Sequence, residues 1–365
     1  EDNLASILFE CHRAYYLPSF FPIIKEMKNR GGYEIYATIP LTMPLEERDI
    51  FSDVCKENEI STITAINETT RVEKLKERKF QIIIVGNVGK IEQIADPSTL
   101  AIMVYHGIGL KQTYYRDITD RIDIRVVESK ERYDILQKQG QKNLVLTGYS
   151  KCDPLVEYDN SQADILDKLG LDPTKKTVLY APSFYPSSIE KISPELAQFS
   201  NEFNLIIKLH NFSWFQKRYQ YQSVLIRTVT DNLKNSFLAQ PFDIDVIPYM
   251  LASDLLISDI SSTIFEFLPL DRPIIMAECF SIRLKHRIFK RRFKRKLDLD
   301  RFDAIDFVYR INEPAQLNGL VYHAIEYPDE MSKMRVDAGE RYLYKTDGKA
   351  SSRLLDVIEK ELQVR

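Results

Sequence analysis

The sequence predicts an α/β fold with two domains, each built on a parallel β-sheet. The chain has 365 residues, which exceeds the length at which a single hydrophobic core usually stops growing. Short apolar runs rich in β-branched residues alternate with helix-like stretches, which is the pattern of βαβ crossovers. This pattern occurs in both halves of the chain, so we expect one sheet in each.

The first half contains six runs that we predict to be strands. They are Ala5 to Cys11, Tyr33 to Ile39, Phe80 to Gly86, Leu100 to Tyr105, Arg125 to Glu128 and Leu144 to Thr147. Helices are predicted at Ser19 to Lys28 and near Lys130 to Gln139. Strands that alternate with helices in this way are typical of a parallel sheet.

The second half repeats the pattern. Its predicted strands are Thr177 to Ala181, Leu205 to Leu209, Leu255 to Ser258 and Pro273 to Met276, with a weaker candidate at Val224 to Arg227. A helix over Ser262 to Phe267 follows the third of these strands, and a last helix runs from Ala350 to Gln363.

The domain boundary is predicted where glycine and proline interrupt a polar stretch, at Gly148, Pro154 and Pro173. We therefore expect an N-terminal domain over residues 1–153, a C-terminal domain over 154–345 and a terminal helix over 346–365. Ligands of parallel α/β sheets bind outside the carboxyl ends of the strands. Residues that follow the predicted strands are the first candidates for a site.

Composition narrows the classes of function. The net charge is −3, so bulk electrostatic attraction to nucleic acid is not expected. The four cysteines are far apart and form no C-x-x-C pair, which argues against a zinc site or a disulfide framework. No apolar run approaches the roughly 20 residues that cross a bilayer, and no signal-like leader opens the chain. We expect a cytoplasmic protein.

A histidine and a lysine bracket a glycine-containing loop after the strand that ends at Tyr105. His106 is followed by Gly107 and Gly109, and then by Lys111. A histidine accepts a proton near neutral pH, and a lysine holds a phosphate as a point charge. His106 is thus a candidate general base, the alternative being a structural histidine in a tight turn. His12, after the first strand, could line the same edge.

A second pair of cations lies at the end of the strand Leu205 to Leu209. Lys208 and His210 share one face because side chains alternate along a strand. Such a pair suits a diphosphate, whereas the plainer interpretation is a solvated strand edge.

Hydroxyl side chains gather where the predicted helix after Ser258 begins. Ser261, Ser262 and Thr263 lie at a helix start, where unpaired N–H groups and the helix dipole favour a phosphate. N-capping would explain one hydroxyl but not a run of three. Glu266, one turn further, could accept hydrogen bonds from a ribose.

Three further side chains are weaker candidates. Ser183 follows the strand Thr177 to Ala181 and could meet a phosphate or a base. Lys151 lies at the domain junction, where a linker held by an Asp-Pro turn is an equally good interpretation. Asp245 and Asp259 could contact a divalent cation, but their spacing does not require a metal, and no metal site is predicted.

Nine cations crowd a segment whose apolar residues recur at spacings of seven and four. They are Arg283, Lys285, Arg287, Lys290, Arg291, Arg292, Lys294, Arg295 and Lys296. A basic amphipathic helix is typical of a membrane-surface element. A nucleic-acid patch and a solvated helix packed on the core are the alternatives.

Together these clusters resemble the CDP-glycerol glycerophosphotransferase family, the primases and polymerases of teichoic acid and related capsule polymers. The resemblance covers about Leu100 to Glu361 and rests on the order of six elements. They are His106-Gly107 with Lys111, Gly148 with Lys151 and Asp153, Leu179-Tyr180-Ala181-Pro182, Lys208 with His210, Ser258-Asp259-Ile260-Ser261-Ser262, and Asp347-Gly348. The chain departs from the family pattern at Asn211, Ile260 and Glu266.

The resemblance implies a GT-B-type fold, in which two Rossmann-like domains face a cleft and the last helix crosses back to the first domain. It implies transfer of a polyol phosphate, most simply glycerol phosphate, from a CDP-polyol to a hydroxyl of a lipid-linked saccharide or polymer, with release of CMP. No cofactor is certain, and a divalent cation is possible. The enzyme would work peripherally on the anionic inner leaflet of the plasma membrane, and nucleic acid is not a partner.

In this scheme His106 would take the proton of the acceptor hydroxyl, and His210 with Lys208 would stabilise the departing CMP. The donor would be bound by Ser183, Asp259, Ser261, Ser262, Thr263 and Glu266, with Lys111, Lys151 and His12 contacting phosphate or acceptor. A GT-B glycosyltransferase or 2-epimerase acting on a nucleotide sugar is the alternative. A non-catalytic nucleotide- or polyanion-binding protein is the second alternative, although a pure binder needs no base.

Overall fold

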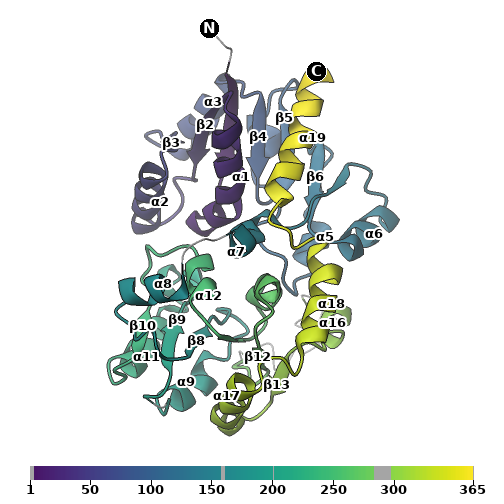
Figure 1. Ribbon diagram of the computed structural model, residues 1–365. Coiled ribbons are helices and arrows are strands. Elements are labelled where there is room, and N and C mark those ends of the chain that lie inside the picture. Colours follow the sequence, from purple (N-terminus) through teal and green to yellow (C-terminus); the bar gives the residue numbers. More distant parts are fainter. Residues whose placement is uncertain (1–3, 158–160, 200, 283–296, 365) are drawn as a thin grey trace. The chain divides into compact units, whose positions relative to one another are not determined.

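The computed structural model describes residues 4–157, 161–199, 201–282 and 297–364. The chain divides into two compact units (Figure 1). The first unit comprises residues 1–108, 114–154 and 340–365, and the second comprises residues 109–113 and 155–339. Each unit is an α/β structure around one parallel sheet, so the predicted fold class is confirmed.

The first unit contains a seven-stranded parallel sheet in the order β3-β2-β1-β4-β5-β6-β7. Its strands are β1 (Ala5–Glu10), β2 (Tyr33–Thr38), β3 (Ser61–Thr62), β4 (Ile82–Val85), β5 (Leu100–Val104), β6 (Ile124–Val127) and β7 (Leu144–Leu146). The central strand β4 is buried on both faces, as expected for a parallel sheet that helices cover on each side. The chain reverses direction across the sheet between β1 and β4.

The helices of the first unit are α1 (Leu17–Arg30), α2 (Leu45–Glu57), α3 (Glu68–Glu77), α4 (Ile91–Ile94), α6 (Lys130–Lys138) and α19 (Ala350–Val364). Short 3₁₀ turns lie at Ala14–Tyr16 and Ser150–Cys152. Three helices span the sequence boundaries of the units: α5 (Thr113–Arg116), α7 (Asp153–Glu157) and α18 (Ser332–Leu343).

The last helix packs on the first one within this unit, and the two lie side by side in Figure 1. Arg30 of α1 pairs with Asp356 at 2.8 Å and with Glu359 at 3.1 Å, both on α19. The buried side of α19 includes Leu354 and Leu355. The end of the chain is therefore an integral layer of the first unit.

The second unit contains a six-stranded parallel sheet in the order β10-β9-β8-β11-β12-β13. Its strands are β8 (Thr177–Tyr180), β9 (Asn204–Ile207), β10 (Ser236–Leu238), β11 (Leu255–Ser258), β12 (Ile274–Ala277) and β13 (Tyr309–Ile311). Its helices are α8 (Gln162–Lys168), α9 (Ile189–Leu196), α10 (Asn211–Phe215), α11 (Gln220–Thr230), α12 (Ile247–Leu251), α13 (Thr263–Glu266), α16 (Leu299–Asp303) and α17 (Leu317–Glu326). Short 3₁₀ turns lie at Leu268–Leu270 and Pro314–Gln316.

One predicted strand is wrong. Val224 to Arg227 lies inside α11, where Ser223, Ile226 and Val229 are buried at helical spacing. The β-branched residues of this stretch suggested a strand, but packing of one apolar face overrides that propensity. One edge strand of the second sheet is β10, only three residues long.

Candidate active site

His106 follows β5 in the first unit and is held by three contacts within that unit. Its Nδ1 lies 2.8 Å from the carbonyl oxygen of Gly86. Its ring stacks on Tyr16, with 3.9 Å between centroids and 8° between planes. The hydroxyl of Ser19 donates to its backbone oxygen at 3.3 Å. A Cβ on Gly86 would lie 2.7 Å from the Tyr16 ring, so only glycine fits beneath this stack.

The contact with the Gly86 carbonyl selects the tautomer of His106. A carbonyl oxygen can only accept, so in the neutral ring Nδ1 carries the proton and Nε2 carries the lone pair. An imidazole in this state accepts a proton at Nε2. The geometry is that of a general base oriented through its other nitrogen.

His12 and Lys151 also belong to the first unit. His12 follows β1 and is half-buried, with its ring 6.4 Å from that of Tyr16. Burial lowers its pKa, and the cations Arg13 and Arg71 lower the pKa further, so His12 is neutral near pH 7. The structure thus brings His12 and His106 to the same tyrosine. Lys151 lies in the 3₁₀ turn Ser150–Cys152 and is half-buried.

The motif that begins at His106 is divided between the units, because residues 109–113 group with the second. Lys111 forms an isolated antiparallel bridge with Leu297, and its Nζ lies 5.1 Å from the centre of the Phe184 ring. Burial lowers the pKa of Lys111. A Cβ on Gly109 would lie 2.9 Å from the hydroxyl oxygen of Ser262, so glycine permits the close approach of this loop to the start of α13.

His210 contacts the same aromatic residue. Its ring is 4.7 Å from that of Phe184, and its Nδ1 accepts the backbone N–H of Phe212 at 3.1 Å. Nδ1 therefore carries no proton in the neutral ring, and Nε2 is a donor. Lys208 is half-buried at the end of β9, with Nζ 3.2 Å from the carbonyl oxygen of Leu209. Lys111 and His210 thus come together around Phe184.

The hydroxyl run at the start of α13 is partly used within the protein. The Ser261 hydroxyl accepts from Thr263, from its hydroxyl at 3.0 Å and from its backbone N–H at 3.3 Å. The Ser261 amide donates to the Asp259 carbonyl at 2.8 Å. The helix spans only Thr263–Glu266 instead of the predicted Ser262 to Phe267. Its dipole is therefore small, and fewer amides are free than expected.

Asp259 is fully buried, and its carboxylate organises the loop after β8. It accepts the backbone N–H of Ser183 at 2.7 Å, the N–H of Ser188 at 2.9 Å and the hydroxyl of Ser188 at 2.8 Å. The Ser183 hydroxyl donates to the Pro186 carbonyl. Burial raises the pKa of Asp259 to about 6, against the lowering effect of these hydrogen bonds. The Asp259 carboxylate and the Ser183 hydroxyl are thus both engaged in hydrogen bonds within the protein.

The remaining acidic candidates are Glu266, which is buried, and Asp245, which accepts a hydrogen bond from the protein backbone. Glu266 is 1% exposed on α13, and Asp245 accepts the backbone N–H of Ile247 at 3.0 Å. Within the residues that the structure describes, no three His, Cys, Asp or Glu side chains gather as a set of metal ligands.

Gly148 and Asp153 hold the terminal helix. Asp153 caps α19 by accepting the N–H groups of Ala350 at 3.0 Å and Ser351 at 2.8 Å. Gly148 has a φ of +90°, and a Cβ there would lie 3.3 Å from Arg353. These two motif positions therefore serve the architecture of the first unit.

The nine cations between Arg283 and Lys296 lie outside the described residues. In the part of the chain that is described, no helix is both long enough and apolar enough to span a bilayer.

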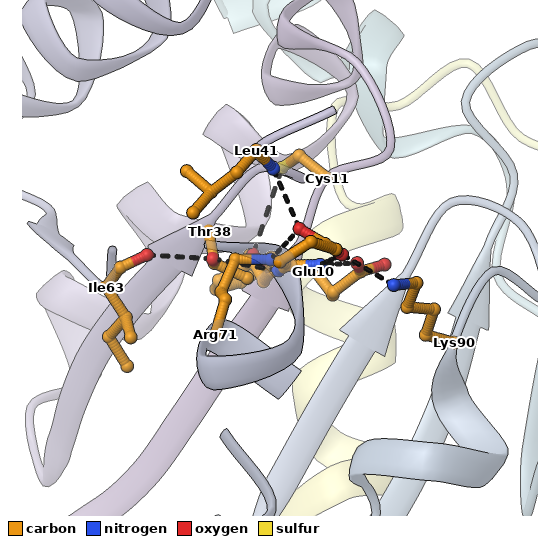
Figure 2. A network of polar contacts seen from close by, with 9 residues as sticks. Glu10, Cys11, Thr38, Leu41, Ile63, Arg71 and Lys90 are labelled. Atoms are coloured by element: carbon orange, nitrogen blue, oxygen red, sulfur yellow. Dashed lines mark hydrogen bonds and ion pairs between the residues drawn. The ribbon is translucent and has the colours of Figure 1, made fainter. Parts of the chain in front are cut away.

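Sequence reasoning did not identify a buried polar network in the first unit (Figure 2). Glu10 is the last residue of β1. Arg71 on α3 forms ion pairs with Glu10 and Glu68. Glu68 also pairs with Lys90. The available signal was a lone carboxylate at the end of the apolar run Ala5 to Cys11, directly before His12.

The fold is a two-unit α/β structure of the GT-B type, with His106 held by the Gly86 carbonyl in one unit and Lys111 and Lys208 in the other. The chain belongs to the CDP-Glycerol:Poly(glycerophosphate) glycerophosphotransferase family, whose model matches residues 82–360. The family that the motifs indicated is thereby confirmed.

Individual relatives agree with this assignment. The chain is 27% identical over 314 residues to the teichoic acid glycerol-phosphate primase of Bacillus subtilis (strain 168), covering 76% of this chain and 73% of that protein. It is 28% identical over 155 residues to the teichoic acid poly(glycerol phosphate) polymerase of Bacillus spizizenii, covering 38% of this chain and 35% of that one.

Solved structures show the same fold. A wall teichoic acid polymerase, TagF, matches with a TM-score of 0.69 at 18% identity, over 99% of this chain and 90% of that one. A UDP-GlcNAc 2-epimerase from Neisseria meningitidis matches with a TM-score of 0.64 at 14% identity, over 98% and 100% of the two chains. Since the fold is common to both, the assignment to the transferases rests on the family match.

Proposed function

We propose that the protein transfers glycerol phosphate from CDP-glycerol to a hydroxyl of a lipid-linked or polymeric saccharide and releases CMP. The observation that carries the residue roles is the opposite hydrogen bonding of two imidazoles. The Nδ1–H of neutral His106 donates a hydrogen bond to the carbonyl of Gly86, whereas Nδ1 of His210 accepts a hydrogen bond from the backbone N–H of Phe212. One ring is therefore a base at Nε2 and the other a donor at Nε2.

The reaction follows from these roles. Nε2 of His106 takes the proton of the acceptor hydroxyl, whose oxygen attacks the phosphorus that bears glycerol. The bond from this phosphorus to the CMP oxygen breaks, and the electron pair leaves with CMP. Nε2–H of His210 and the ammonium groups of Lys208 and Lys111 stabilise the charge on the departing phosphate. Such transfer depends mainly on positioning and on electrostatic stabilisation.

The first test measures CMP release from CDP-glycerol and CDP-ribitol, with UDP-sugars as the comparison and a synthetic lipid-linked acceptor. CMP from CDP-glycerol supports the proposal, and CMP from CDP-ribitol alone changes the polyol. UDP release or epimerisation of a nucleotide sugar, without CMP, would contradict the proposal. Repeating the assay with a chelator determines whether a divalent cation takes part.

A second test separates the base from the binding groups. We expect His106→Ala to lower kcat about 10²- to 10⁴-fold, the usual contribution of a general base, while the Kd of CDP-glycerol changes little. Lys208→Ala should instead weaken donor binding. Equal losses of rate and donor affinity in His106→Ala would refute the role of base.

We also propose that the enzyme binds the anionic inner leaflet through the basic segment of residues 283–296. The support is the sequence pattern, because each Lys or Arg near such a surface contributes about 1 kcal/mol. Replacing the nine cations by glutamine should abolish sedimentation with vesicles that contain anionic phospholipid. Unchanged sedimentation would refute this location.

A further inference from the structure

The first sheet has a topological switch point between β1 and β4, where the strand order reverses. Crevices at such points are the usual ligand sites of open parallel sheets. Glu10 is the last residue of β1, and Asn87 and Gly89 follow β4. These residues play no part in the chemistry assigned above.

Glu10 is a buried carboxylate with too few hydrogen bonds. It is 1% exposed, and its Oε1 lies 3.5 Å from an amino group of Arg71. Arg71 makes shorter contacts with Glu68, at 2.7 and 2.9 Å, and with Thr38 at 3.0 Å (Figure 2). Oε2 of Glu10 is buried and has no hydrogen-bond partner among the described residues. An acceptor in this state costs free energy until a donor reaches it.

A second such oxygen lies beside the first. Oδ1 of Asn87 is likewise buried and without a hydrogen bond in the described part of the chain. A Cβ on Gly89 would lie 3.2 Å from Oε2 of Glu10 and 3.1 Å from Oδ1 of Asn87. Both oxygens therefore converge beneath Gly89, which is exposed and has a φ of +49°. A shift of this glycine would open both oxygens to a ligand.

The chemistry of the pair selects the ligand. Two acceptors need a group that donates hydrogen bonds, and hydroxyls of a sugar or polyol do so without bringing charge. A phosphate would meet the carboxylate of Glu10 with like charge. The pair therefore favours a neutral hydroxylated unit over a phosphate.

The position relative to the base is suitable for the acceptor. β4 separates β1 from β5, the strand that His106 follows. Neighbouring strands are about 4.8 Å apart, so β1 and β5 lie roughly 10 Å apart. Glu10 is level with Val85 and Met103 in the sheet, and His106 follows Met103 by three residues. The loop that begins at Gly86, whose carbonyl orients His106, continues to Asn87 and Gly89.

We propose that Glu10 and Asn87 form an acceptor subsite that binds hydroxyl groups of a neutral saccharide unit next to the hydroxyl presented to His106. This inference rests on the proposed function and adds to it the class of acceptor. A neutral saccharide end is preferred over a chain end of glycerol phosphate units. Glu10 lies before the family match, which begins at residue 82.

Gly89→Ala tests the subsite, because its methyl group would cover both oxygens without removing any polar group. The matched control is Gly140→Ala, in the same unit, where φ is +89° and no atom lies within 4 Å of the added Cβ. The assay uses a synthetic lipid-linked disaccharide and the same molecule extended by two glycerol phosphate units. Donor affinity and thermal stability are measured in parallel.

We expect Gly89→Ala to raise the KM for the disaccharide more than tenfold, with kcat and the KM for CDP-glycerol within twofold of wild type. Gly140→Ala should leave all three within twofold. Asn87→Ala, which removes one oxygen without adding a methyl group to the backbone, should raise the same KM several-fold. Asn87→Ala also tests the subsite if Gly89→Ala folds poorly.

A binding measurement keeps this test separate from the proposed reaction. Saturation-transfer NMR detects binding of the disaccharide in the absence of CDP-glycerol. Loss of the signal in Gly89→Ala supports the subsite even if CMP is never released. Equal signals in wild type, Gly89→Ala and Asn87→Ala overturn the subsite even if CMP release is normal. A lower KM for the glycerol phosphate-extended acceptor overturns the preference for a neutral unit.

Discussion

Tyr16 is the residue whose ring stacks on His106. The two rings are parallel at 3.9 Å, and the small residue Gly86 leaves room for the tyrosine beneath the imidazole. When His106 takes a proton it becomes a cation over an aromatic face, an interaction worth about 0.5–2 kcal/mol. The stack therefore stabilises the protonated base as well as positioning it.

Tyr16→Leu should consequently affect both the position of His106 and the stability of its protonated form. We expect kcat to fall about tenfold or more, and the acidic limb of kcat/KM against pH to move to lower pH, because the protonated form loses its stabilising ring. Tyr16→Phe keeps the ring and should restore both to near wild type. A purely structural role would lower the melting temperature of Tyr16→Leu without moving the limb.

At the scale of elements, Glu68 joins helix α3 to two loops. It accepts from Arg71 on its own helix, from Lys90 at 2.6 Å and from the backbone N–H of Leu41 at 2.8 Å. Burial raises the pKa of Glu68, but these hydrogen bonds outweigh burial and hold the pKa at about 2. The folded state therefore prefers the ionised form.

The sign of the pH dependence follows. A carboxylate with a depressed pKa stabilises the fold above its unfolded pKa of about 4.5 and loses that effect as pH falls toward 2. A shift of this size corresponds to about 3 kcal/mol. We expect Glu68→Gln to lower the free energy of unfolding by roughly this amount at pH 6 and by about half as much at pH 3, measured with urea.

Glu59 supplies the control, because its side chain is 87% exposed although it pairs with Lys28. Glu59→Gln should cost less than about 1 kcal/mol at both pH values. If Glu68→Gln destabilises the protein equally at pH 6 and pH 3, the ionised carboxylate is not the source of the stability.

The elements differ in how well the sequence foretold them. Long buried strands such as β1 and β5 were predictable from runs of apolar residues, whereas β3, with two residues, and β10, with three, present no periodicity. The same holds at the site. Local motifs located His106 and His210, but the partner of His106 is a carbonyl 20 residues away. Glu10 and Asn87 meet only because β1 and β4 are neighbours.

At the scale of the whole molecule, the first unit is assembled from segments that come before and after the main segment of the second unit in the sequence. The last of them, Glu340–Arg365, supplies α19. Asp153 and Arg30 bind this helix at its start and along its length. Residues 1–154 by themselves would leave the surface beneath α19 exposed and the carboxylate of Asp153 without its two N–H donors.

We therefore expect a fragment of residues 1–154 to lack a cooperative thermal transition, and a synthetic peptide of residues 340–365 to restore one. The restoring free energy comes from Leu354, Leu355 and Ile358, since burying each contributes about 1.5–3 kcal/mol. A peptide with these three residues changed to serine is the control and should restore nothing. Circular dichroism measures both. A cooperative transition in the fragment without peptide would show that α19 is an addition to the first unit and not part of its core.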